Sequence, residues 1–227
     1  MRKETTTPGE YYHIFNRGIN KNDIFYNDLD RLRFLFLITH LQSAVSFKNI
    51  SREIKLLVQS RALHSCVDKE IIAEICKERF IELVAFALMP NHFHLLIREV
   101  QENGIPQYMH KILTAYSKYI NIKHEKDGHV LQGPYRIVHV DNNEQLTYLS
   151  AYIHRNPRDL QAWTNKEISY PWSSYQDFAR ENRWEELLNP SIVLNQFTTK
   201  KSYREFVDTS TAKLKVSDSA IKDLFLE

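Results

Sequence analysis

The sequence is poor in cysteine. Its 227 residues include only Cys66 and Cys76, which show neither the CxxC spacing of a zinc or redox motif nor a disulfide framework. This usage is typical of a reducing compartment, so we expect a cytoplasmic protein. We interpret both cysteines as small packed side chains.

Long apolar runs are missing as well. No stretch approaches 18 uncharged apolar residues, and the first residues, MRKETTTPGEYYHIF, lack the apolar centre of a signal peptide. We therefore expect no membrane association. A content of 43% hydrophobic residues is enough for a buried core, in one domain or in one domain with an extension.

A strong net charge is the third missing feature. The formal net charge is +2 and the pI is about 8.4. Affinity for nucleic acid would therefore have to come from the placement of basic residues, because the total charge decides little.

Hydrophobic periodicity predicts the order strand, helix, helical arm, two strands, helix, strand, helix. The expected strands are 10–18, 80–90, 92–100 and the extended segment 129–141, and the expected helices are 27–44, 51–63, 68–80, 107–128 and 142–156. We expect helix 142–156 to end before Pro157, because a residue that precedes proline is disfavoured in the helical region.

This order predicts an α+β fold with a ferredoxin-like antiparallel sheet that carries helices on one face. An extra C-terminal helix and a helical insertion at about 45–79 complete it. We expect one domain over 1–160 and an extension over 161–227 that packs on the core. The second face of the sheet is expected to stay open.

The stretch LMPNHFHLLI places two histidines in an apolar strand that follows a Pro-Asn turn. Because strand side chains alternate between faces, His92 and His94 share one side with Leu96. Two such imidazoles can offer nitrogen to one divalent ion, although a stable site needs more ligands. The alternative is a pair of half-exposed histidines without a ligand.

The last predicted helix supplies a further ligand candidate. Tyr152 and Asn156 lie four residues apart and so share one helical face. The Asn156 amide oxygen could complete a metal shell, and a phenol beside a metal-bound phosphate is a potential nucleophile. Helical position alone does not choose Tyr152 over Tyr116, Tyr119 or Tyr148.

Four segments together resemble a known family. They are NRGINKNDIF, MPNHFHLLI, YSKYINIKHEKDGHVLQGPYRIVHV and YLSAYIHRNP. In order and approximate spacing they are similar to the single-tyrosine HUH transposases of the IS200-like superfamily, most of all to its REP-associated branch. The resemblance covers most of Glu10 to Asp159.

The resemblance implies a metal-dependent enzyme that cleaves and rejoins single-stranded DNA. His92 and His94 would be ligands of Mg²⁺ or Mn²⁺, Asn156 would be the third ligand, and Tyr152 would form a 5′-phosphotyrosine. Insertion-sequence relatives typically have glutamine at the position of Asn156, whereas REP-associated ones look like this chain.

The resemblance also implies a hairpin or palindromic-repeat DNA partner, bound by a monomer or a homodimer, and hence a nucleoid-associated protein. Lys and Arg outnumber acidic residues between Lys111 and Arg158. The candidates for DNA contact are Arg17, Lys21, Arg136 and Arg155; Arg17 and Arg136 fall inside the matched motifs. The alternative for each is an ordinary solvated side chain.

Two other functions stay open. A non-catalytic DNA-binding regulator could use the same scaffold, although it would not need the histidines, Tyr152 and Asn156 together. A metal-dependent phosphodiesterase that uses water would tolerate phenylalanine at Tyr152 and normally needs more carboxylate ligands. Beyond residue 160, we expect Trp172 and Tyr175 to anchor the segment SYPWSSYQDF to the core.

Overall fold

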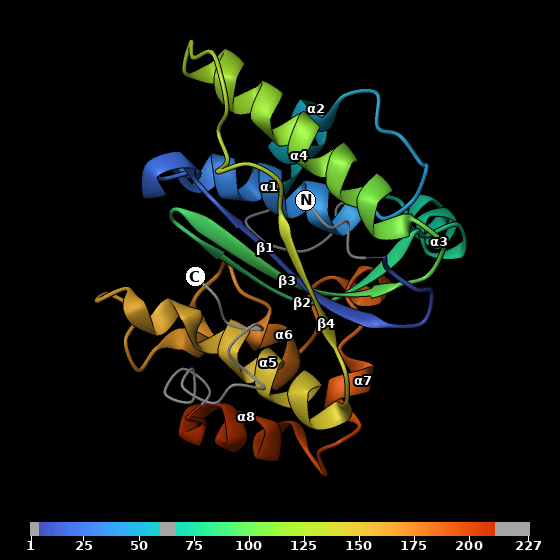
Figure 1. The fold of residues 1–227 in the computed structure, drawn as a ribbon, viewed down its shortest axis with the longest axis vertical. Coiled ribbons are helices and arrows are strands. Elements are labelled where there is room, and N and C mark those ends of the chain that lie inside the picture. Colours follow the sequence, from blue (N-terminus) through green and yellow to red (C-terminus); the bar gives the residue numbers. More distant parts are fainter. Residues whose placement is uncertain (1–4, 60–66, 212–227) are drawn as a thin grey trace.

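The computed structural model describes residues 5–59 and 67–211. Four antiparallel strands form one sheet with the order β2-β3-β1-β4. Their bounds are β1 Tyr11–Arg17, β2 Ile81–Met89, β3 His92–Glu99 and β4 Arg136–Val140. Figure 1 shows this sheet in the middle of the molecule, with helices above and below it. The predicted α+β fold class and the predicted order of elements are confirmed.

The helices above the sheet in Figure 1 build the larger core. They are α1 Asp28–His40, α2 Ile50–Gln59, α3 Lys69–Lys77 and α4 Gly104–Lys123. Helix α1 begins where the Asn27 side chain accepts a hydrogen bond from the Asp30 amide. The insertion joins this core through buried residues such as Ile54 and Ile75. Residues 60–63 of the predicted helix 51–63 lie outside the described residues.

The second face of the sheet is covered, so the expectation that it stays open is wrong. Helices α5 Asn143–Arg155, α6 Tyr175–Ala179, α7 Ser191–Leu194 and α8 Lys200–Thr209 lie below the sheet (Figure 1). They form a second core with apolar side chains of β2 and β3, among them Val84 and Leu96. The reason is physical: the strands are apolar on both faces, and this face also gains from burial.

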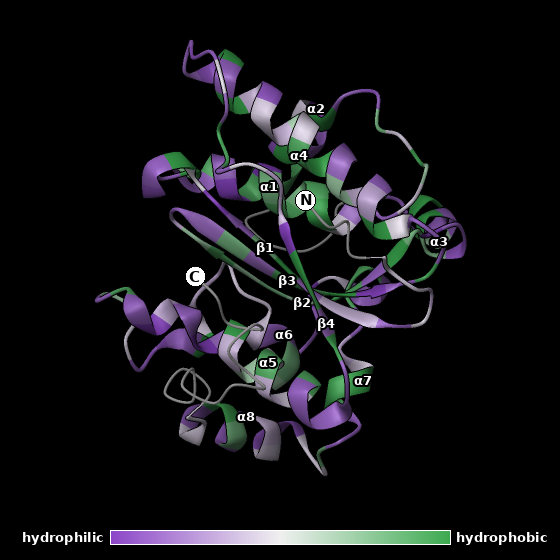
Figure 2. Cartoon of the chain, viewed as in Figure 1, coloured by the Kyte–Doolittle hydropathy of each residue, from purple (hydrophilic) through white to green (hydrophobic). Residues whose placement is uncertain are grey.

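Helices of both layers have a mixed surface. Figure 2 shows hydrophilic and hydrophobic residues alternating along α4 and α8, as expected for helices with one buried side.

Short 3-10 turns connect the longer elements: η1 Ile19–Lys21, η2 Asn156–Asp159, η3 Glu167–Ser169 and η4 Glu185–Leu187. Within residues 5–59 and 67–211, no helix has the length and apolar character needed to cross a membrane.

The C-terminal segment covers the outer edge of β2. The Leu88 amide donates to the Trp172 carbonyl at 2.9 Å, and the Ser174 amide donates to the Phe86 carbonyl at 3.0 Å. Trp172 is 7% exposed and Tyr175 is 1% exposed, which confirms that both anchor this segment. An edge strand that is paired in this way offers few free groups to another chain.

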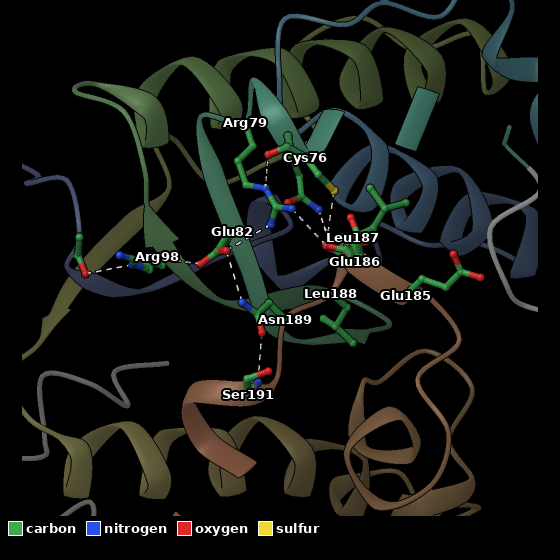
Figure 3. A network of polar contacts seen from close by, with 12 residues as sticks. Cys76, Arg79, Glu82, Arg98, Glu185, Glu186, Leu187, Leu188, Asn189 and Ser191 are labelled. Atoms are coloured by element: carbon green, nitrogen blue, oxygen red, sulfur yellow. Dashed lines mark hydrogen bonds and ion pairs between the residues drawn. The ribbon is translucent and has the colours of Figure 1, made fainter. Parts of the chain in front are cut away.

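A polar network fixes the next part of this segment (Figure 3). The Glu82 carboxylate of β2 accepts hydrogen bonds from Arg79 at 3.4 Å, from Arg98 at 3.2 Å and from the Asn189 side chain at 3.3 Å. The backbone amide of Asn189 also donates to the Leu83 carbonyl at 2.9 Å. Segment 172–189 is therefore hydrogen-bonded along much of β2.

Candidate functional site

The site begins on the face of the sheet where β1 and β3 run side by side. The strand register places Arg17 opposite His92 and Phe15 opposite His94. The two imidazole centroids are 5.1 Å apart and their planes are nearly perpendicular, at 85°. Strand alternation therefore brings both predicted histidines together, as the sequence indicated.

Asn91 orients the first imidazole. Its Nδ2 donates to the Lys21 carbonyl at 3.0 Å, and its Oδ1 lies 2.7 Å from Nδ1 of His92. Because an amide oxygen only accepts, Nδ1 of His92 carries the proton and donates it; in a neutral imidazole this leaves the lone pair on Nε2. The sequence indicates Asn91 only as a turn residue, so this contact was not predicted.

His13 contacts the second imidazole. Its Nε2 lies 2.9 Å from Nδ1 of His94, and the two rings are stacked with centroids 5.1 Å apart. His13 is fully buried, and His94 is 2% exposed, whereas we expected it on an open face. His13 is not among the site residues predicted from the sequence. Its signal was the alternation in YYHIFNR, which puts His13 on the same face as Phe15 and Arg17.

Helix α5 brings the predicted tyrosine to these histidines. The helix begins at its predicted cap, where the Asn142 side chain accepts from the Gln145 amide. The Tyr152 ring lies edge-on to His94, at 5.4 Å between centroids and 86° between planes. Tyr152 is 2% exposed, so the ring is covered in this state.

Asn156 follows one helical turn later and is fully buried. Its Nδ2 donates to the Tyr152 carbonyl at 3.0 Å, so its Oδ1 faces the other way. Oδ1 is buried and has no hydrogen-bond partner within the described ranges. The position before Pro157 predicts that α5 ends at Asn156. The helix ends at Arg155, yet Asn156 keeps a helical φ of −51° and ψ of −43° despite Pro157.

The donor chemistry of these residues fits a divalent ion. A buried amide oxygen that lacks a donor calls for an unseen partner, such as water or a cation. Imidazole nitrogen is a common donor to divalent transition metals, and a carbonyl oxygen such as that of an amide suits Mg²⁺ and Mn²⁺. Across 5–59 and 67–211, no group of three or more His, Cys, Asp or Glu residues could hold a metal ion. If an ion binds here, His92, His94 and Asn156 carry donor atoms of the types that would hold it.

A cavity of about 480 Å³ opens next to the histidines. It brings together three of the four basic residues proposed for DNA contact, Arg17, Lys21 and Arg136, with both His92 and His94. None of the described residues that line it is acidic. A cavity with this charge suits phosphate groups.

The fourth basic residue, Arg155, does not line this cavity. Its Nη1 donates to the carbonyls of Val207 at 3.1 Å and Asp208 at 3.4 Å, and to the Ser210 carbonyl. Burial lowers the pKa of this guanidinium. The structure therefore places Arg155 at the end of α8, and its contact with DNA stays a prediction.

Residues 7–156 match the model of a protein family described as IS200-like transposases. The chain belongs to the IS200-like transposase family. The solved structure of a REP-associated tyrosine transposase bound to a REP hairpin has a similar fold, with a TM-score of 0.51 and 14% identity over 81% of this chain and 86% of that chain. No curated protein matches the chain.

In this IS200-like transposase, α5 is tied to both the sheet and α8 by His154. Nδ1 of His154 lies 2.6 Å from the Tyr203 hydroxyl, and Nε2 lies 2.8 Å from the Ser174 hydroxyl. The Ser174 hydroxyl also accepts from the Phe86 amide of β2 at 2.9 Å. Burial lowers the pKa of His154 to about 3, so the imidazole is neutral. These bonds fix the backbone that carries Tyr152.

The four tyrosines that the sequence offers as candidate nucleophiles have different surroundings in the structure. Tyr116 and Tyr119 lie on α4, on the opposite face of the sheet, where their hydroxyls donate to the Ile24 carbonyl and to Asp30. The Tyr148 ring packs against Phe206 of α8, at 5.5 Å between centroids. Tyr152 is the one of these four whose ring contacts His94.

Proposed function

We propose that this IS200-like transposase cleaves and rejoins single-stranded DNA at a hairpin or palindromic repeat through a 5′-phosphotyrosine on Tyr152. The observation that carries the proposal is the edge-on contact between Tyr152 and His94, next to His92. A nucleophile needs this proximity to the groups that activate its phosphate.

The basic cavity supports DNA as the substrate. Arg136 of β4 pairs with Phe15 of β1, and Arg17 lies two residues further along β1 on the same face of the sheet. Their charges and that of Lys21 would hold the phosphates beside the histidines. The REP-associated transposase with the similar fold is bound to a REP hairpin, which favours a hairpin here.

The proposed cofactor is Mg²⁺ or Mn²⁺, held by His92, His94 and Asn156. When bound, such an ion would polarise the scissile phosphate and offset its negative charge. The absence of acidic residues among the described lining of the cavity disfavours a phosphodiesterase that relies on carboxylate ligands.

The proposed cleavage step is a balanced exchange of ester bonds. The Tyr152 hydroxyl oxygen attacks the phosphorus, a phosphotyrosine bond forms and the bond from phosphorus to the 3′ oxygen breaks. The phenolic proton ends on the released 3′-hydroxyl. The reverse step, with the 3′-hydroxyl of another strand, rejoins the DNA, so the reaction needs no nucleotide cofactor.

The burial of Tyr152 adds one requirement to this mechanism. The ring is 2% exposed and is not among the residues that line the cavity. The ring must therefore turn toward the cavity when DNA binds. Because His154 fixes the backbone of α5, the proposal assigns this movement to the side chain.

The test compares Tyr152→Phe with Tyr148→Phe, one helical turn away on α5. Each protein is incubated with Mn²⁺ and a labelled single-stranded hairpin, and covalent complexes are resolved on a denaturing gel. We expect the wild-type protein and Tyr148→Phe to form the covalent complex, and Tyr152→Phe to form none.

Two outcomes would contradict the proposal. If Tyr152→Phe still cleaves the hairpin, Tyr152 is not the nucleophile; cleavage without a covalent complex would then identify water as the nucleophile and the chain as a phosphodiesterase. If the wild-type protein binds the hairpin but neither cleaves it nor forms a covalent complex, the non-catalytic alternative is correct.

A further inference from the structure

His13 is a buried titratable residue that the proposed mechanism does not use. It is fully buried on β1, and its ring is stacked on Phe15, at 4.7 Å between centroids. It also meets the Tyr152 ring edge-on at 6.2 Å. One side chain thus contacts both a proposed metal ligand, His94, and the proposed nucleophile.

The hydrogen bond between His13 and His94 limits which nitrogen of His94 can bind a cation. A neutral imidazole has one N–H donor and one acceptor nitrogen. If Nδ1 of His94 donates to Nε2 of His13, then Nε2 of His94 keeps its lone pair for a ligand. If His13 donates instead, the proton of His94 lies on Nε2 and blocks it. The direction of this single bond decides whether His94 can be a ligand.

A purely structural role for His13 explains less. A fully buried polar ring costs stability unless its nitrogens are hydrogen-bonded, and an apolar ring would pack on Phe15 without that cost. The 2.9 Å distance and the near-parallel rings, at 20°, place the two facing nitrogens in hydrogen-bond contact. Metal-ligating histidines commonly use their second ring nitrogen in this way.

We propose that His13 is a positioning residue for the transposase site. It accepts the Nδ1–H proton of His94 and so fixes the tautomer and the ring orientation in which Nε2 of His94 serves the cation. Asn91 does the same for His92. The proposal rests on the proposed function, because it assigns His94 to a metal.

The first test reads the tautomer directly, without metal or DNA. Long-range ¹H–¹⁵N correlation spectra of ¹⁵N-histidine-labelled protein distinguish a protonated Nδ1 from a protonated Nε2, and a His94→Gln spectrum assigns the signals. We expect the Nδ1–H form for His94 in the wild-type protein and in His13→Gln, whose side-chain oxygen can still accept. We expect a mixture or the Nε2–H form in His13→Phe.

The second test measures Mn²⁺ affinity by electron paramagnetic resonance of the free ion. Loss of a residue that orients a ligand typically weakens metal binding roughly 10- to 100-fold, so we expect this change for His13→Phe and a smaller one for His13→Gln. His139→Phe is the control, because His139 is a half-exposed histidine of β4 whose nitrogens contact Glu10 and Asp141. We expect its Mn²⁺ affinity to equal that of the wild type.

The outcomes separate this proposal from the proposed function. A wild-type His94 in the Nε2–H form overturns the role of His13, and this reading does not depend on how His13→Phe folds. Unchanged Mn²⁺ affinity in a folded His13→Phe protein overturns it as well. If His92→Ala and His94→Ala both leave Mn²⁺ affinity unchanged, the proposed metal site fails, whatever the tautomer is.

Discussion

The buried histidines of this chain have two kinds of surroundings. His13 and His94 face each other at the candidate site, whereas His40 and His154 are held in apolar cores. Nδ1 of His40 lies 2.8 Å from the Thr39 hydroxyl, and its ring is stacked on Phe36. Burial lowers the pKa of His40 to about 4. Because a histidine held in an apolar core binds a proton more readily in the unfolded chain, the stability of the protein depends on pH.

We predict that His40 makes the protein less stable in acid. The unfolded chain binds a proton at His40 below about pH 6.5, whereas the folded chain binds it only near pH 4, so stability falls as the pH drops through this window. The free energy of unfolding should fall by about 2 kcal/mol between about pH 7.5 and about pH 5 from this residue. Urea unfolding at both values measures it.

His40→Gln provides the comparison. Both proteins keep His154, whose pKa is also lowered, so the difference between their pH dependences belongs to His40. We expect a smaller loss of stability in His40→Gln over the same range. An identical loss in the two proteins would show that His40 is protonated in the folded state as readily as in the unfolded chain.

At the scale of elements, the decisive feature is how α5 is attached. The β2 edge holds Ser174, the Ser174 hydroxyl contacts His154 of α5, and the other nitrogen of His154 contacts Tyr203 of α8. The Tyr203 hydroxyl also donates to Ser150 at 3.1 Å. The helix with the proposed nucleophile is therefore held by residues that lie after the region matched by the family model.

We predict that Tyr203→Phe lowers the free energy of unfolding by about 1 to 3 kcal/mol, because a buried nitrogen of His154 loses its partner. Tyr175→Phe is the matched control. The Tyr175 hydroxyl contacts Asp208, whose side chain is 50% exposed, so water can replace the lost group. Urea unfolding compares the two variants. Equal stability of Tyr203→Phe and the wild type would show that His154 does not depend on this hydroxyl.

At the scale of the whole molecule, segment 161–211 is part of the folded unit. It contributes apolar side chains to the second core, and the backbone amides of Ser174 and Asn189 donate to carbonyls of β2. The division into a domain over 1–160 and an extension over 161–227 stays a prediction. In the structure, residues 161–211 share hydrogen bonds and apolar contacts with the residues that precede them. Shared burial of this kind makes unfolding cooperative.

We predict that hydrogen exchange reports one cooperative unit. The amides of Leu88, Ser174 and Asn189 donate to carbonyls across the β2 edge, so they should exchange about as slowly as the amides of the central strands. Native-state exchange followed by NMR measures this. If Ser174 and Asn189 exchange orders of magnitude faster than β3, segment 172–189 opens independently of the sheet.

The sequence by itself determined the elements and the residue types of the site. Alternation along HFHLLIRE puts His92 and His94 on one face, and the four-residue spacing in YIHRN puts Tyr152 and Asn156 on one side of a helix. These are properties of local backbone geometry, and they need no knowledge of the rest of the chain. Turn and cap residues such as Asn27 and Asn142 set the helix starts for the same reason.

Only the tertiary structure decided which of these faces meet. The pairing of β1 with β3 brings His13 to His94, over 81 residues of sequence separation, and no local pattern contains that register. The C-terminal helices pack on the second face of the sheet and cover it. In this arrangement the Arg155 side chain donates to the Val207 carbonyl of α8. The docking of α5 on the sheet also decides that the Tyr152 ring lies edge-on to His94. Long-range docking is set by the burial of whole apolar faces, which the sequence of one segment does not specify.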